Sequence, residues 1–105
     1  MRVVLAPAAE EDADEQNSWW REHRPDSPDL FDDEIAACIA RLEEDAAAIV
    51  MFRRVGLTTV RRIHLAGTRR HVYFVIDEDH VTILAIWGSV RRVLPRLRER
   101  ALVPR

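Results

Sequence analysis

The sequence contains no lysine, because all 16 of its basic residues are arginine. Arginine stays charged in proteins and presents a planar fork of N–H donors, which suits binding of carboxylate or phosphate but not proton transfer. The composition therefore excludes lysine as a proton carrier in any catalytic site. An arginine-only composition is also typical of codon usage in a GC-rich genome.

Other scarce features exclude further classes of protein. The single cysteine, Cys38, excludes an internal disulfide and a cysteine-based zinc site. Only three glycines are present, so a glycine-rich phosphate loop is absent. No apolar run approaches the roughly 20 residues that span a bilayer, and the start of the chain lacks the pattern of a signal peptide. We expect one cytoplasmic domain over residues 1–105 and no membrane contact.

The charged residues that are present divide the chain into two halves. Residues 1–52 hold four arginines and fourteen acidic residues, a net charge of −10. Residues 53–105 hold twelve arginines and four acidic residues, a net charge of +8. The overall charge of −2 thus conceals an acidic half followed by a basic half, and the basic half predicts an anionic partner.

The acidic half predicts a strand and two helices. Arg2 to Ala6 is apolar enough for a short strand, and apolar spacing predicts helices from Ala8 to about His23 and from about Asp29 to Ala47. Two prolines separate the helices, which we expect to form an antiparallel hairpin. Cys38 lies on the apolar stripe of the second helix, where a small buried residue is expected. Trp19 and Trp20 are predicted to cap the core at the end of the first helix.

The basic half predicts three strands and a final helix. Residues 51–59 are expected to form a loop or an irregular strand, followed by strands over residues 60–66, 70–77 and 80–87. The third strand is nearly all apolar and should be buried on both faces. An amphipathic helix interrupted at Pro95 is predicted from Val90, Val93, Leu94, Leu97 and Ala101. The fold class is α+β: an N-terminal strand and a two-helix hairpin packed on a curled antiparallel sheet, with a short C-terminal helix.

Paired arginines at the strand ends are the first candidates for function. Arg61-Arg62, Arg69-Arg70 and Arg91-Arg92 lie at strand starts or ends, where a curled sheet could gather them into one basic patch. A solvated sheet face is the alternative interpretation. His64, His71 and His80 match no metal-ligand spacing, so we expect neither a metal nor a cofactor.

Residues 60–92 resemble the RelE/ParE family of bacterial type II toxins. The run Thr68-Arg69-Arg70-His71-Val72-Tyr73 and the run Ala85-Ile86-Trp87 resemble the ParE-type branch, and the order of elements agrees. The resemblance implies a small toxin that a cognate antitoxin binds and neutralises in a hetero-oligomer. Binding of target or antitoxin is then expected at Arg62, Arg69, Arg70, His71, Tyr73, Trp87, Arg91 and Arg92.

The resemblance leaves two activities open. ParE-type members inhibit DNA gyrase and are not enzymes, whereas RelE-type members are endoribonucleases that cut messenger RNA on the ribosome. Arg70, Tyr73 and Arg91 would be the catalytic candidates of a nuclease. No lysine is present and no aromatic or imidazole residue follows Trp87, so the residues favour the gyrase-directed, non-enzymatic branch. Gly88 stands where ParE-like members commonly carry histidine, which also allows a non-toxic binding module.

Overall fold

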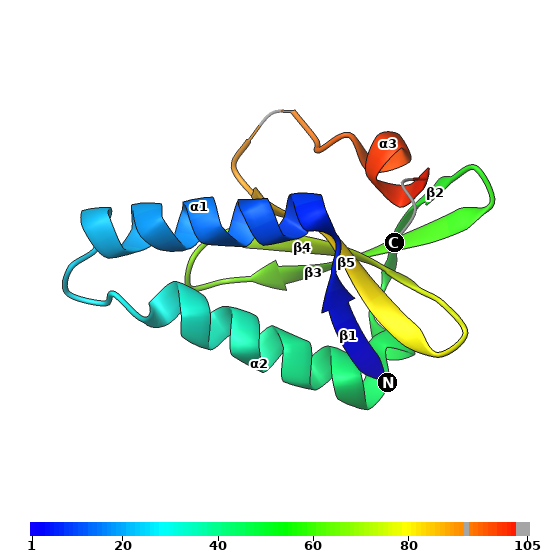
Figure 1. The fold of residues 1–105 in the computed structure, drawn as a ribbon, viewed down its shortest axis with the longest axis horizontal. Coiled ribbons are helices and arrows are strands. Elements are labelled where there is room, and N and C mark those ends of the chain that lie inside the picture. Colours follow the sequence, from blue (N-terminus) through cyan, green and yellow to red (C-terminus); the bar gives the residue numbers. More distant parts are fainter. Residues whose placement is uncertain (92, 103–105) are drawn as a thin grey trace.

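The structure is a computed structural model and describes residues 1–91 and 93–102. It contains a strand, two helices, a meander of four strands and a short terminal helix (Figure 1). In chain order the elements are β1 (Arg2–Leu5), α1 (Pro7–His23), α2 (Leu30–Asp45), a 3-10 turn η1 (Ala46–Ala48), β2 (Met51–Val55), β3 (Thr58–Leu65), β4 (Arg70–Ile76), β5 (His80–Gly88) and α3 (Leu97–Leu102). The α+β fold class predicted from the sequence is confirmed.

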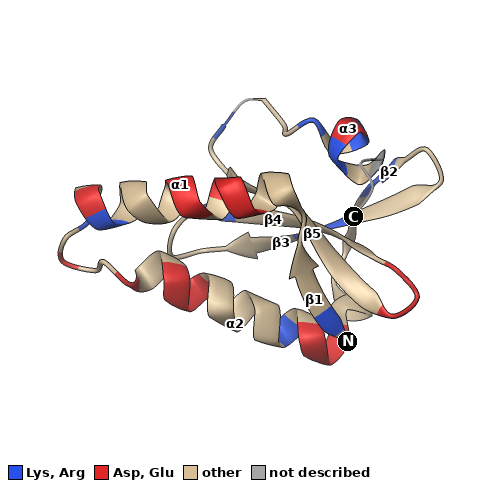
Figure 2. Ribbon diagram, in the orientation of Figure 1, with Lys and Arg blue, Asp and Glu red and all other residues tan. Residues whose placement is uncertain are grey.

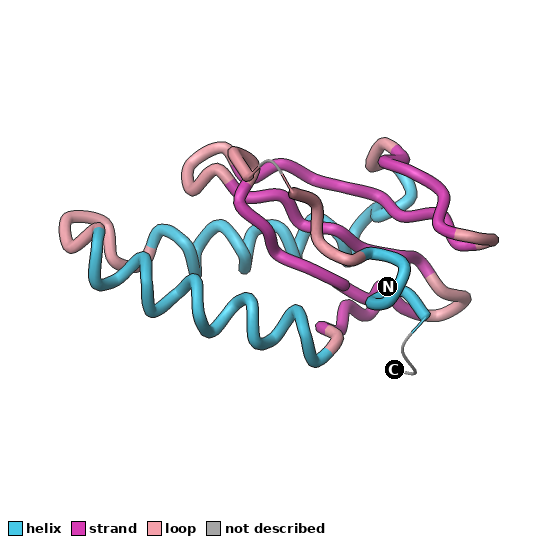
Figure 3. Tube along the Cα trace, turned by 90° about the horizontal axis from the view of Figure 1, so that it is seen from above, coloured by secondary structure: helices cyan, strands magenta, loops and turns pink. Residues whose placement is uncertain are grey.

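The helical hairpin forms because each helix has one apolar stripe. In α1 the stripe includes Ala9 and Trp20, which are buried, and Pro7 occupies the first helical turn, where its missing N–H costs nothing. In α2 the stripe includes Phe31, Cys38 and Leu42. Both stripes pack on the same side of the sheet, and Figure 3 shows the helices side by side along it.

The sheet is mixed, which corrects the antiparallel sheet predicted from the sequence. Its strand order is β1-β5-β4-β3-β2, and β1 pairs with β5 in parallel, whereas the other neighbours are antiparallel. The two helices connect β1 to the first strand of the meander, at the far edge of the sheet. The meander then returns across the sheet, so its last strand, β5, lies beside β1. As expected, β5 is central, and residues 81–86 are all buried.

Two apolar clusters lie on opposite faces of the sheet. The larger one packs α1 and α2 against residues such as Val72 and Phe74 of β4. The smaller one includes Tyr73 and Val75 of β4 together with Leu97 of α3. This alternation along β4 is the one that the sequence predicted. The helical hairpin therefore packs against one face, and the short α3 packs against part of the other (Figures 1 and 3).

Two further segments can be compared with the prediction. Residues 51–55 form an edge strand, β2, with a bulge between Met51 and Arg53, which agrees with the irregular strand predicted as one of two alternatives for residues 51–59. A turn at Gly56, whose φ of 63° suits glycine, joins β2 to β3. The predicted C-terminal helix forms only over Leu97–Leu102, and Val90 and Val93 are exposed in a loop. Pro95 disfavours helix in the residue before it, and Trp87 Nε1 donates a hydrogen bond to the Val93 carbonyl, which holds the loop in its own shape.

Candidate functional site: an aromatic and basic sheet face

The predicted site residues divide between the two faces of the sheet. Arg62, His71, Tyr73 and Trp87 lie on the face that α3 partly covers, because strand alternation and pairing place Arg62 opposite Tyr73 and His71 opposite Trp87. Arg70 lies on the other side, where it contacts α1. The single basic patch predicted from the sequence is therefore two separate groups of arginines.

We call the first group the aromatic–arginine face. It consists of Phe52, Arg62, His64, His71, Tyr73 and Trp87, with Arg91 at its edge. These residues come from β2, β3, β4 and β5 and from the loop after β5. The sequence did not predict Phe52, because residues 51–59 carry no clear strand pattern and its face could not be assigned.

Ring contacts run continuously across this face. The His64 and His71 rings have centroids 5.0 Å apart, and the His71 and Tyr73 centroids are 6.1 Å apart. Phe52 meets Tyr73 edge-on at 5.3 Å, and the Arg62 guanidinium carbon lies 4.2 Å from the centre of the Phe52 ring. Such edge-on and cation–π contacts hold side chains in defined positions, so the surface is arranged before any partner binds.

The positive charges of the face are not neutralised within the described residues. Neither Arg62 nor Arg91 forms an ion pair with any carboxylate in residues 1–91 and 93–102. The Arg91 guanidinium carbon lies instead 4.3 Å from the centre of the Trp87 ring. Unpaired guanidinium groups beside aromatic rings can bind a carboxylate or a phosphate of another molecule.

His71 titrates abnormally within this arrangement. Partial burial lowers the pKa of the His71 imidazole, and the nearby positive charges of Arg62 and His64 lower it further. A lowered pKa favours the neutral form of the His71 imidazole. His80, which the sequence placed beside the other histidines, lies at the far end of β5, where it contacts Asp77 and Asp79.

The remaining predicted residues take other positions. Arg69 is exposed in the turn before β4, with a φ of 55°, and Arg61 turns away from the face to donate to the Ile49 carbonyl. Arg92 lies outside the described residues. Trp20 caps the core as predicted, whereas Trp19 is 41% exposed and does not.

Neither a metal site nor a reactive thiol is evident in the described chain. No group of three or more histidine, cysteine or acidic residues in residues 1–91 and 93–102 could hold a metal ion. Cys38 is buried, and this burial raises the pKa of its thiol to about 11. A thiol of such high pKa is a poor nucleophile at neutral pH.

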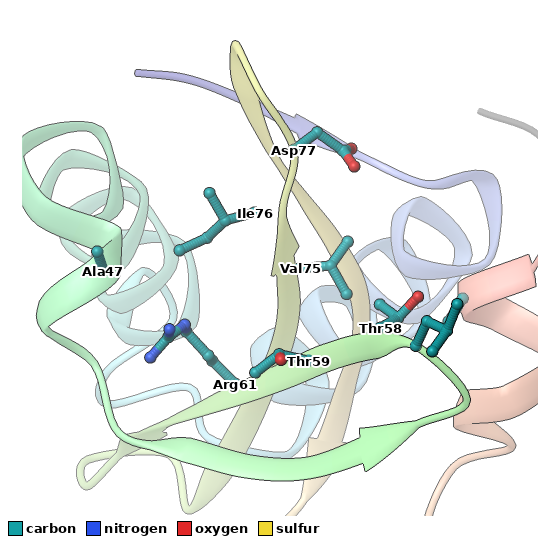
Figure 4. A pocket seen from close by; sticks show the side chains of 9 residues that line it. Ala47, Thr58, Thr59, Arg61, Val75, Ile76 and Asp77 are labelled. Atoms are coloured by element: carbon teal, nitrogen blue, oxygen red, sulfur yellow. The ribbon is translucent and has the colours of Figure 1, made fainter.

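One hollow bordered by described residues lies away from the aromatic–arginine face. It has a volume of about 540 Å³ and is bordered by Thr58, Thr59 and Arg61 of β3 and by the end of β4 (Figure 4). The Arg61 guanidinium is already engaged with the Ile49 carbonyl at 2.6 Å. None of the seven predicted site residues within the described chain borders this pocket, so we do not assign the site to it.

Comparison with known proteins identifies one family. The model of a family described as the ParE toxin of the type II toxin–antitoxin system parDE matches residues 3–93. This range includes α1, α2, strands β2 to β5, all but the first residue of β1, and the aromatic–arginine face, whereas α3 lies outside it. A search of curated proteins finds no match. Among the described residues, no helix is long and apolar enough to cross a bilayer.

Proposed function

Since this chain belongs to the ParE toxin family and is therefore a toxin of a type II toxin–antitoxin system, we propose that it inhibits growth by binding DNA gyrase in the cytoplasm. We further propose that the entire chain acts as one domain and that a cognate antitoxin neutralises it through the aromatic–arginine face. The observation that carries the proposal is the unpaired guanidinium group of Arg62, held beside Phe52 on an ordered sheet face.

The chemistry of the face defines the antitoxin segment that would fit it. The face offers aromatic rings for apolar side chains and guanidinium groups for carboxylates, so it favours an extended or helical segment with both. Each buried side chain of the size of leucine or phenylalanine would contribute about 1.5–3 kcal/mol. The acidic residues of the toxin itself lie mainly on α1 and α2, away from this face (Figure 2).

Expression without the antitoxin tests the function directly. The chain is placed under an inducible promoter, and growth, DNA breaks and transcript integrity are measured together. A gyrase-directed toxin stops growth and causes DNA-damage signalling while transcripts remain intact. Harmless expression of folded protein would contradict the proposal and would favour a non-toxic binding module, which Gly88 in place of the family's usual histidine allows.

A messenger RNA endonuclease is the second candidate, because two imidazoles able to transfer protons lie in contact on the face, beside the phenol of Tyr73, which is 1% exposed. His64, His71 and Tyr73 are in ring contact, and His71 has a lowered pKa. However, Arg70 lies on the opposite side of the sheet from Tyr73, so the catalytic set Arg70, Tyr73 and Arg91 is not brought together. The nuclease predicts cut transcripts in expressing cells, with cutting lost in His71→Gln and retained in His23→Gln, which changes an exposed histidine of α1.

A further inference from the structure

Arg70 is partly buried, yet among the described residues it has no carboxylate partner, which a partly buried arginine normally has. Its Nε donates to Gln16 Oε1 at 2.8 Å, and its Nη1 donates to the Thr68 carbonyl at 2.7 Å. Both acceptors are neutral, and no carboxylate among the described residues forms an ion pair with Arg70. The guanidinium is therefore fixed in position while its charge is left without a counterion.

An acidic residue that approaches the turn before Arg70 already has other hydrogen-bond partners. Glu34 of α2 approaches the same turn, but its two carboxylate oxygens accept hydrogen bonds from the backbone of Gly67 and Thr68 and from the Thr68 hydroxyl. Burial lowers the pKa of Arg70, and the positive charge of Arg91 lowers it further. The surroundings thus disfavour the charged form of Arg70, and an incoming anion would relieve this cost.

Gln16 is held so that it supports this arrangement. Its Nε2 donates to the Ile86 carbonyl at 2.6 Å, which directs its Oε1 toward Arg70. The side chain therefore connects the middle of α1 to β5 and to the start of β4. A guanidinium whose Nε and Nη1 are held in this way is pre-organised, so little rotational freedom is lost when a ligand binds.

An exposed tryptophan lies beside the guanidinium. The Arg70 guanidinium carbon is 6.0 Å from the centre of the Trp19 ring, and the Arg24 guanidinium carbon is 5.6 Å from the same ring. Trp19 is 41% exposed although it stacks on His23, with ring centroids 4.5 Å apart. Exposed tryptophan and arginine are the residues that most often contribute strongly to binding at protein interfaces.

We propose that Gln16, Trp19, Arg24 and Arg70 form a second binding site, which takes an aspartate or glutamate side chain flanked by apolar residues on a partner protein. The carboxylate bonds the free edge of the Arg70 guanidinium, and the neighbouring apolar residue lies on the Trp19 ring. Gln16 and Arg70 lie on the side of the sheet that the helical hairpin covers, whereas Arg62 and Tyr73 of the aromatic–arginine face lie on the other side.

The charge around the site favours one carboxylate over a nucleic acid. Glu15 and Glu22, which precede and follow Trp19 along α1, are exposed, as are Asp32 and Asp33 of α2. Figure 2 shows acidic segments along both helices. A phosphate backbone carries many negative charges and would be repelled by this surface, whereas a single carboxylate between apolar residues would be repelled much less.

Titration of the purified full chain tests this site without reference to growth inhibition, so its outcome is independent of the proposed toxin function. The probes are the peptide acetyl-Leu-Asp-Leu-amide, its neutral counterpart acetyl-Leu-Asn-Leu-amide and a short single strand of thymidylate. The readouts are the NMR signals of the Arg70 Nε–H and of the Trp19 indole N–H. We expect both signals to move in a saturable way with the aspartate peptide and to stay unchanged with the asparagine peptide.

Substitutions identify the residues responsible. Arg70→Lys keeps the charge but loses the fork, and should weaken binding of the aspartate peptide about tenfold, whereas the matched change Arg54→Lys on the exposed edge strand should leave it unchanged. If Arg70→Lys impairs folding, the comparison of the two peptides on the unsubstituted protein still tests the site. Trp19→Leu should then also weaken binding of the aspartate peptide. The proposal would be overturned if both peptides bound equally or if the two arginine substitutions had equal effects. It would also be overturned if thymidylate moved the Arg70 signal more than the aspartate peptide does.

Discussion

Glu34 shows how a single side chain determines the shape of the turn between β3 and β4. Its carboxylate accepts hydrogen bonds from Gly67 N and Thr68 N, each at 2.8 Å, and from Thr68 Oγ1 at 2.6 Å. A Cβ atom at Gly67 would lie 2.7 Å from Glu34 Oε2, so any larger residue at this position would require the Glu34 side chain to move. The turn that positions Arg70 is thus attached to α2.

Glu34→Ala should lower the free energy of unfolding by about 1–3 kcal/mol, because the substitution leaves backbone N–H groups of the turn without an acceptor. Asp33→Ala is the matched control, since Asp33 is exposed on the same helix. Chemical denaturation of both variants measures the difference. If the two variants were equally stable, the turn would not depend on Glu34.

His71 makes the stability of the protein depend on pH. Burial and the charges of Arg62 and His64 lower its pKa, so the unfolded chain, with an ordinary value of about 6.5, binds a proton before the folded protein does. Stability should therefore fall as the pH is lowered from about 7.5 to about 5.5. Thermal unfolding across this range should show a smaller loss of stability in His71→Gln than in the unsubstituted protein.

The control for this pH dependence is His23→Gln, which changes an exposed histidine of α1. Its melting temperature should fall with pH as steeply as that of the unsubstituted protein. An unchanged slope in His71→Gln would show that other groups cause the pH dependence.

The environment of single residues could be predicted from the sequence where strand alternation decides it. On β3, Arg62 and His64 lie on one face and Ile63 and Leu65 on the other, as expected, and on β4 Tyr73 is on the same face as Val75. Gln16 was expected only to share the face of α1 with apolar residues. Its bond to Arg70 depends on contact between residues far apart in the sequence, so no local pattern could reveal it.

Among the elements, α3 depends on one charged contact with α1. Arg100 Nη1 lies 2.7 Å from Asp12 Oδ2, with side-chain exposures of 19% and 12%, and it also donates to the Leu84 carbonyl. Asp12 Oδ2 additionally accepts a hydrogen bond from Ile86 N. The three elements α1, β5 and α3 thus meet at a single carboxylate.

Arg100→Ala should detach α3 from the sheet and cost about 1.5–3 kcal/mol, since a largely buried charged hydrogen bond is lost. Amide hydrogen exchange should then increase in α3 and in the part of β5 beneath it. Arg98→Ala changes an exposed arginine of the same helix and should leave exchange unaltered. Equal exchange in the two variants would contradict a role for the Asp12 contact.

The elements themselves were predicted well where their apolar pattern is long. The helices over Pro7–His23 and Leu30–Asp45 and the buried strand β5 follow from periodicity alone. The predicted C-terminal helix was too long. Val90, Val93 and Leu94 have helical spacing, but all three are exposed, so no buried apolar face stabilises a helix there. The strand β2 was predicted only as one of two alternatives, a loop or an irregular strand, because its burial alternates irregularly around a bulge between Met51 and Arg53.

At the scale of the whole molecule, the division of charge along the chain becomes a division in space. The acidic residues gather on the helical hairpin, and most of the arginines lie on the sheet and in the C-terminal segment (Figure 2). The aromatic–arginine face therefore carries a positive potential that can accelerate encounter with an acidic antitoxin segment.

Association with the antitoxin should slow roughly tenfold as ionic strength rises from low to moderate values, because salt screens this attraction. Arg62→Gln should reduce this dependence on salt, whereas Arg41→Gln, which changes an exposed arginine of α2, should not. Stopped-flow measurement across a salt series gives both slopes. An association rate indifferent to ionic strength would exclude electrostatic attraction as a cause of binding.

The sequence by itself determined the α+β fold class, the helical hairpin, the buried central strand and the separation of charge, because these follow from local periodicity and composition. Only the tertiary structure decided that β1 lies parallel to β5 and that Arg62 and Arg70 face opposite sides of the sheet. It also decided that Phe52 completes one face and that Trp19 and Gln16 surround Arg70 on the other. The physical reason is that each of these arrangements depends on contacts between segments distant in the sequence, which no local pattern specifies.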